Sequence, residues 1–257
     1  MKPKQSTGYV IYRGPSMLDG APIVAVAIVN SRNAKTGDMV QTFIMREDVE
    51  PHTALTTGDD ASVCGDCKHR PSLGGACYVR TFQGPLSVHR AYHRGNYPAD
   101  DGYMAQTACA GRMVRLGTYG DPMAVPAEVW ERLTRNAVGR TGYTHQWRNE
   151  SVGDDQRRRI VALCMASVDS IAEQAIAHAS GLRYFRIRTA DEPLQAREFM
   201  CPASEEAGKR KDCASCGACD GSERGAKASP VIVVHGPLAS RFARQRTAFA
   251  SPQTSTS

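Results

Sequence analysis

The sequence predicts an α/β fold, a partial or irregular (βα) barrel with mostly parallel strands, an N-terminal hairpin and two cysteine-rich metal-binding loops. Short apolar runs alternate with amphipathic helical stretches at the spacing of βαβ units. Two β-rich runs, residues 22–29 and 40–45, precede this alternation and are expected to pair as the hairpin. The strongly patterned βα units are too few for eight, so a complete barrel is not expected.

We expect one α/β domain over residues 1–236 and a disordered polar tail over residues 237–257. The chain has 257 residues, 41% hydrophobic and 23% charged, which is ordinary for a globular protein with one sizeable core. It has no apolar run of about 18 residues and no apolar N-terminal segment. The sequence therefore predicts no membrane association and a cytoplasmic location, where thiols stay reduced.

The net charge of +6 permits contact with nucleic acid without requiring it. Basic residues gather at residues 157–159, 209–211 and 241–246. Runs of this kind are more often a solvated surface than a binding face. Nucleic acid therefore remains one of the partners that the sequence allows.

The middle of the chain shows weak periodicity before two short helices. Residues 46–84 are expected to form a long loop, and long loops in compact domains are usually functional or disordered. Helices are expected over residues 86–94 and 101–111, the second capped by Asp100 or Asp101.

From residue 113 onward, strands and helices alternate. The expected strands cover residues 113–119, 141–147, 160–166, 182–188 and 230–235. A helix opens at Pro126 and ends at Gly139, and residues 154–159 are expected to form a short polar turn. Ser170 and Glu173 form a capping box that should begin the next helix.

Polar side chains follow the ends of these strands, where parallel α/β proteins place their sites. The candidate catalytic residues are Asp121, His145 and Asp169. The structural alternative is a turn for Asp121, a structural hydrogen bond for His145 and the start of a helix for Asp169. The candidate cofactor-binding residues are Thr118, Tyr119, Arg186 and Arg188. The two arginines line one strand face, which suits an anionic substrate or a cofactor carboxylate.

Four cysteines lie close together near the C-terminus: Cys201, Cys213, Cys216 and Cys219, in a C-x11-C-x2-C-x2-C spacing. The C-x2-C-x2-C run is close to the ligand run of ferredoxins. Four thiolates also satisfy tetrahedral zinc. We expect a metal here, and favour [4Fe–4S] over zinc because zinc knuckles usually use two separate CxxC pairs.

A second set, Cys64, Cys67 and Cys77, supplies three cysteines in a C-x2-C-x9-C spacing. Three protein ligands leave one coordination position open, as a catalytic metal requires. His69 and Cys109 are the candidates for a fourth ligand, and closure by His69 would instead make a structural zinc clip. We expect the scaffold to bring both cysteine sets to one end of the sheet.

Several segments in combination resemble the phage gene product 88 family and related phage proteins. The first segment is the Cys-x2-Cys unit that leads to residues 77–79. The others are residues 115–121, 143–147 and 167–169, and the segment that begins with Cys201-Pro-Ala-Ser and ends with the C-x2-C-x2-C run. The resemblance covers residues from about 60 to 236. It implies a phage or prophage origin, and hence a host cytoplasm.

A more distant likeness is to radical SAM enzymes, which combine a partial (βα) barrel, a three-cysteine [4Fe–4S] cluster with one open iron, and often further clusters. Their C-x3-C-x2-C spacing is replaced here by C-x2-C-x9-C. The place of their Gly-Gly-Glu-like segment, which binds the amine of S-adenosylmethionine, can be taken here only by residues 118–121.

Two functions follow as hypotheses. The first is an iron–sulfur enzyme, with an open three-cysteine cluster that binds S-adenosylmethionine or substrate and a four-cysteine auxiliary cluster. Its substrate would be a small molecule or a nucleic-acid-derived group. The alternative is a zinc-stabilised protein that binds nucleic acid or a host protein without catalysis.

Overall fold

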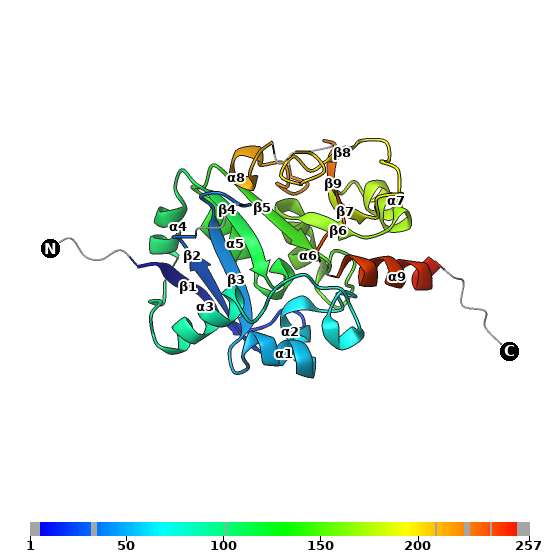
Figure 1. Ribbon diagram of the computed structural model, residues 1–257. Coiled ribbons are helices and arrows are strands. Elements are labelled where there is room, and N and C mark those ends of the chain that lie inside the picture. The colour runs from blue at the N-terminus through cyan, green and yellow to red at the C-terminus, as the bar shows by residue number, and fades with distance from the viewer. Residues whose placement is uncertain are drawn as a thin grey trace.

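The computed structural model describes residues 6–31, 35–100, 102–208, 210–223, 227–236 and 238–250. They form a mixed α/β structure around a nine-stranded, mostly parallel sheet that does not close, in the order β1-β2-β3-β4-β5-β6-β7-β9-β8 (Figure 1). The strands are β1 Gly8–Pro15, β2 Pro22–Ile28, β3 Val40–Arg46, β4 Met113–Tyr119, β5 Gly139–Thr144, β6 Met165–Val168, β7 Tyr184–Arg188, β8 Glu198–Met200 and β9 Ser229–Val233. The predicted α/β class is confirmed.

The sheet changes from antiparallel to parallel at β3. β1 pairs with β2 and β2 with β3 in antiparallel register, so the predicted hairpin is confirmed and extended by one strand. Every later pairing is parallel. The strands from β3 to β7, followed by β9, therefore all point the same way and end at one edge, which we call the carboxyl edge.

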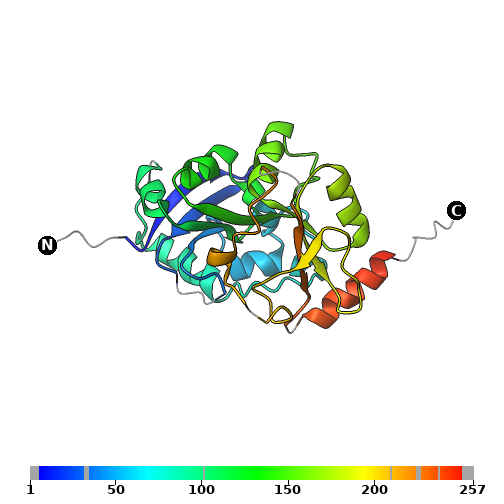
Figure 2. The same ribbon diagram turned by 90° about the horizontal axis from the view of Figure 1, so that it is seen from above.

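Helices lie on both faces of the sheet. They are α1 Pro51–Thr57, α2 Ala61–Cys64, α3 Gly84–His93, α4 Tyr103–Cys109, α5 Ala127–Thr134, α6 Asp154–Leu163, α7 Ile171–Ala179, α8 Cys213–Cys216 and α9 Ala239–Ala250. In Figure 2 the green helices α5 and α6 lie on one side of the sheet, and the cyan segment with α1 and α2 lies on the other. In the described part of the chain, no helix is long and apolar enough to cross a membrane.

The strand predicted over residues 160–166 is wrong in its first half. Helix α6 continues through Leu163, and only Met165–Val168 is strand. Ile160 and Leu163 are three residues apart, so both lie on the buried face of this helix. A short apolar run cannot separate a buried helical turn from a strand by its periodicity.

Two segments predicted to be irregular contain helices. The expected loop over residues 46–84 includes α1 and α2. The predicted disordered tail includes α9. Phe242 anchors this helix: it is only 3% exposed, and its ring stacks on that of His69 with centroids 5.5 Å apart. Residues 251–257 of that tail lie outside the described residues. So does Asp101, while the Asp100 carboxylate accepts hydrogen bonds from the first turn of α4, as predicted.

Candidate functional site

The segment that carries the first cysteines is fixed to the carboxyl edge by hydrogen bonds. The backbone N–H of Asp121, just after β4, donates to the carbonyl of Val63 at 2.6 Å. The Gln146 amide, just after β5, donates to the carbonyl of Cys64 at 3.0 Å. Gly65 adopts a left-handed φ of 58°, and a Cβ there would lie 2.3 Å from the Gln146 side chain. The end of α2 therefore lies directly on the strand ends.

The thiols of Cys64, Cys67 and Cys77 lie near one another on half-buried residues. Burial raises the pKa of Cys64 well above its usual value, and the neighbouring Cys67 and Cys77 raise it further. Burial also raises the pKa of Cys67 to about 12 and that of Cys77 to about 11. At neutral pH these thiols are protonated, and a bound cation is what would stabilise them as thiolates.

A buried ion pair ties this loop together. The Arg70 guanidinium lies 2.7 Å from the Asp60 carboxylate. It also donates to the carbonyls of Gly65 at 2.9 Å and Gly58 at 2.6 Å. Arg70 is 9% exposed and Asp60 is fully buried, so the pair is screened from water. We call Arg70 and Asp60 the loop clamp.

The two candidates for a fourth ligand have different surroundings. His69 places its Nε2 2.9 Å from Oδ2 of Asp169, after β6. Cys109 is fully buried on α4, which packs against β1 and α5. Burial raises the pKa of Cys109 to about 12, and its charged neighbours are Arg112 and Asp100. Cys109 is thus packed in the core, whereas His69 lies beside the three-cysteine set: its backbone N–H donates to the Cys67 thiol, and its Nδ1 has no hydrogen-bond partner among the described residues.

His69, His145 and Asp169 form a compact group beside the cysteines. One candidate ligand atom from each lies within 4.8 Å of the other two. Burial opposes ionisation of Asp169, but the hydrogen bond and charge of His69, with His145 and Lys68, hold its pKa below the usual range. Of the sequence candidates, the structure thus brings together His145 and Asp169 and adds His69 to them.

No family model, curated protein or solved structure matches this chain.

Asp121 and Tyr119 border the same site. The Asp121 carboxylate accepts from the backbone N–H groups of Met123 at 3.0 Å and His145 at 2.7 Å. Burial raises its pKa against these hydrogen bonds. Asp121 therefore also stabilises the turn after β4, which the sequence offered as its structural role. The Tyr119 hydroxyl is buried without a hydrogen-bond partner among the described residues, and burial, with Cys64 nearby, raises its pKa.

The other cofactor candidates lie apart from this group. Thr118 donates to the Gln41 side chain at 2.9 Å. Arg186 is fully buried and forms ion pairs with Glu198 at 2.6 Å and Glu192 at 3.1 Å, so its charge is balanced within the protein. Arg188 donates to backbone carbonyls that follow β7. The structure offers none of these three as part of the site at the carboxyl edge.

The four-cysteine loop lies at the opposite end of the sheet from α2, so the expectation that both sets share one end is wrong (Figure 1). Backbone N–H groups of Cys213 and Ala214 donate to the carbonyls of Lys35 and Thr36, just before β3. The three-cysteine loop follows a parallel strand, whereas residues 213–219 lead toward the start of β9. The two ends of parallel strands lie at opposite edges of a sheet.

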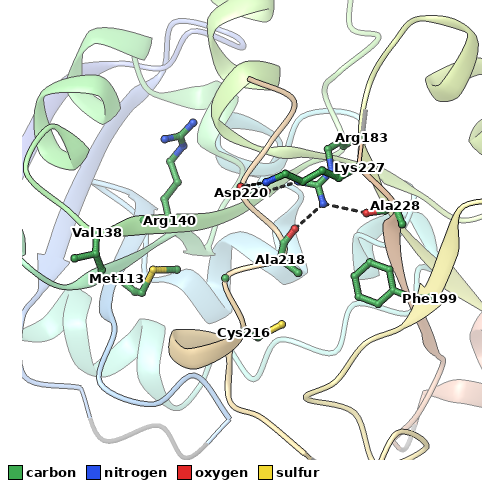
Figure 3. A pocket seen from close by; sticks show the side chains of 12 residues that line it. Met113, Val138, Arg140, Arg183, Phe199, Cys216, Ala218, Asp220, Lys227 and Ala228 are labelled. Atoms are coloured by element: carbon green, nitrogen blue, oxygen red, sulfur yellow. Dashed lines mark hydrogen bonds and ion pairs between the residues drawn. The ribbon is translucent and has the colours of Figure 1, made fainter. Parts of the chain in front are cut away.

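Strand residues contact the second cysteine set. The Tyr143 hydroxyl donates to the Cys219 thiol, although burial still raises the pKa of Cys219 to about 12. The Arg115 guanidinium lies over the Tyr143 ring and opposes the rise in the pKa of Cys213 that burial causes. A cavity of about 500 Å³ opens beside Cys216 at the amino ends of β4 and β5 (Figure 3).

Sequence reasoning missed the loop clamp and the link from His69 to Asp169. His69 was weighed only as a fourth ligand for the cysteines. Its partner lies 100 residues away in the chain. No local pattern marks such a contact, although the clustering of His69 with the CxxC unit was visible.

Proposed function

We propose that the protein is an iron–sulfur enzyme similar to radical SAM enzymes, in which Cys64, Cys67 and Cys77 hold a [4Fe–4S] cluster with one open iron. The observation that carries this proposal is that the three thiols lie together at the carboxyl edge, near enough for each to affect the pKa of another. Of the two candidates for a fourth ligand, Cys109 is packed in the core, and His69 is hydrogen-bonded to Asp169 through its Nε2. Three ligands and one open position are what a catalytic metal requires.

We favour iron–sulfur over zinc on the spacing of the cysteines. The C-x2-C-x2-C run is close to the ligand run of ferredoxins, whose thiolates bind separate corners of a cubane. Zinc knuckles usually use two separate CxxC pairs.

The arrangement of the strands supports the same assignment. Six parallel strands, β3 to β7 and then β9, lie in an order that follows the chain, which is the pattern of a partial (βα) barrel. The three-cysteine loop follows the first of them at the carboxyl edge. We propose that Tyr119 and Asp121, at the end of β4, hold the amine of S-adenosylmethionine, since Tyr119 already borders the thiols.

We assign the four-cysteine set to an auxiliary [4Fe–4S] cluster with a structural or electron-relay role. Its four thiols would complete the ligation of a cubane. Tyr143 and Arg115 supply a hydrogen bond and a positive charge beside them. Such groups tune the potential of a cluster. The substrate class, a small molecule or a nucleic-acid-derived group, stays a prediction.

The test is anaerobic purification followed by iron and sulfide analysis. Two clusters predict about eight iron and eight sulfide ions per chain. The variant Cys64→Ser/Cys67→Ser/Cys77→Ser should retain about half of each, and Cys109→Ala, as the matched control, should retain all. Stoichiometric zinc without sulfide would reject the proposal in favour of the zinc-stabilised binding protein. Nucleic-acid binding by that protein would weaken steeply with salt.

A further inference from the structure

Three side chains from separate parts of the chain converge beside the three cysteines. His69 comes from the loop after α2, His145 from the end of β5 and Asp169 from the end of β6. One ligand atom from each lies within 4.8 Å of the others. His69 and Asp169 are 9% and 2% exposed. Two imidazoles and one carboxylate thus meet in a largely buried place.

Each of the three carries a buried polar atom without a hydrogen-bond partner among the described residues. These atoms are His69 Nδ1, His145 Nε2 and Asp169 Oδ1. A buried polar atom left without a partner costs free energy, and natural proteins hold few of them. Three in one group point to a shared ligand. A cation satisfies imidazole nitrogen and carboxylate oxygen together.

We propose that His69, His145 and Asp169 form a binding site for one divalent first-row transition-metal ion. Two histidines and one carboxylate are an established donor set for zinc and for non-haem iron(II). Three protein ligands leave positions for water or substrate. An ion there would lower the pKa of bound water and polarise a substrate oxygen. The site uses none of the cysteines as ligands, although it lies beside Cys67.

The surroundings of the group explain how its affinity is set. The Lys68 ammonium lies 3.1 Å from Asp169 Oδ2 and 3.0 Å from Glu173. The Glu173 carboxylate in turn accepts a hydrogen bond from the backbone N–H of Asp169 at 2.7 Å, which orients the Glu173 carboxylate. Lys68 repels a cation bound to Asp169. Replacing Lys68 by methionine should therefore tighten metal binding, by about tenfold for a charge this close and partly exposed.

The experiment is a titration of the full chain with Mn²⁺, followed by the EPR signal of the free ion. Manganese prefers carboxylate oxygen to the soft thiolate, so the cysteine sets compete for it only weakly. We expect one Mn²⁺ per chain, loss of binding in His145→Ala and Asp169→Asn, and tighter binding in Lys68→Met. His235→Ala, at an exposed histidine, is the control and should bind as the wild type does.

Two outcomes would overturn the proposal. One is binding by the wild type weaker than about 1 mM. The other is equal binding by the His145→Ala and His235→Ala variants. If His145→Ala does not fold, pulsed EPR of Mn²⁺ bound to the wild type decides the question. Nitrogen couplings from two imidazoles support the site, and their absence rejects it. Iron and sulfide content tests the cluster proposal separately.

Discussion

Replacing Arg70 by methionine should destabilise the protein through the loop clamp. The Arg70 guanidinium pairs with Asp60 at 2.7 Å and holds the carbonyls of Gly58 and Gly65. Methionine keeps much of the apolar stem but removes the charge and all the donors. The Asp60 carboxylate, which is fully buried, would then lie in the interior without its cation.

The size of the effect follows from that unpaired charge. Removing one partner of a buried ion pair costs about 3–5 kcal/mol. We therefore expect Arg70→Met to lower the free energy of unfolding by about 3–5 kcal/mol, measured by urea denaturation. The double variant Arg70→Met/Asp60→Asn should recover part of the loss, because no charge is then left buried.

The control for this experiment is Arg158→Met. Arg158 pairs with Asp155 at 2.9 Å on the surface, where both side chains are more than two-thirds exposed. Exposed pairs contribute about 0–1 kcal/mol. If Arg70→Met lost no more stability than this control, or if the double variant lost as much as the single one, the clamp would not act as we argue.

Three further predictions concern the fold around the site. Gly65→Ala should lower the melting temperature, because φ of 58° and a Cβ 2.3 Å from Gln146 strain any side chain there; an unchanged melting temperature would contradict the close approach. Ser170→Ala should cost about 1 kcal/mol in urea denaturation, since the Ser170 hydroxyl caps α7; a cost near zero would exclude the cap. Burial raises the pKa of Glu198, but the hydrogen bond and charge of Arg186 outweigh it and hold that pKa below its usual value. The stability that this ion pair contributes is complete above the ordinary glutamate pKa of about 4.3 and is lost as pH falls through the lower pKa of the folded state. Glu198→Gln should therefore flatten that part of the curve of stability against pH. An unaltered curve would refute the pairing.

Local patterns predicted the elements of the fold well where one signal dominated. The alternation in residues 113–119 and the capping box at Ser170 both correspond to observed elements, β4 and the start of α7. The prediction failed in residues 160–166, where a short apolar run fits a buried helical turn as well as a strand. It also missed α9, whose Phe242 is buried against a distant histidine.

The candidate site was predicted only in outline. The carboxyl-edge rule identified His145, Asp121 and Asp169, because parallel strands end together. It also suggested Arg186, whose charge is in fact balanced by Glu198, 12 residues later in the chain. Pairs of this kind depend on long-range packing. A charged residue in a strand looks the same in the sequence whether it faces a ligand or a buried partner.

The central claim, an open [4Fe–4S] cluster on Cys64, Cys67 and Cys77, is tested most directly by EPR of the reduced, anaerobically prepared protein with and without S-adenosylmethionine. The account predicts a reduced-cluster signal that changes when S-adenosylmethionine is added. It predicts no such change in the variant Cys64→Ser/Cys67→Ser/Cys77→Ser. A wild-type signal that S-adenosylmethionine leaves unaltered, or a protein with zinc and no sulfide, would contradict it.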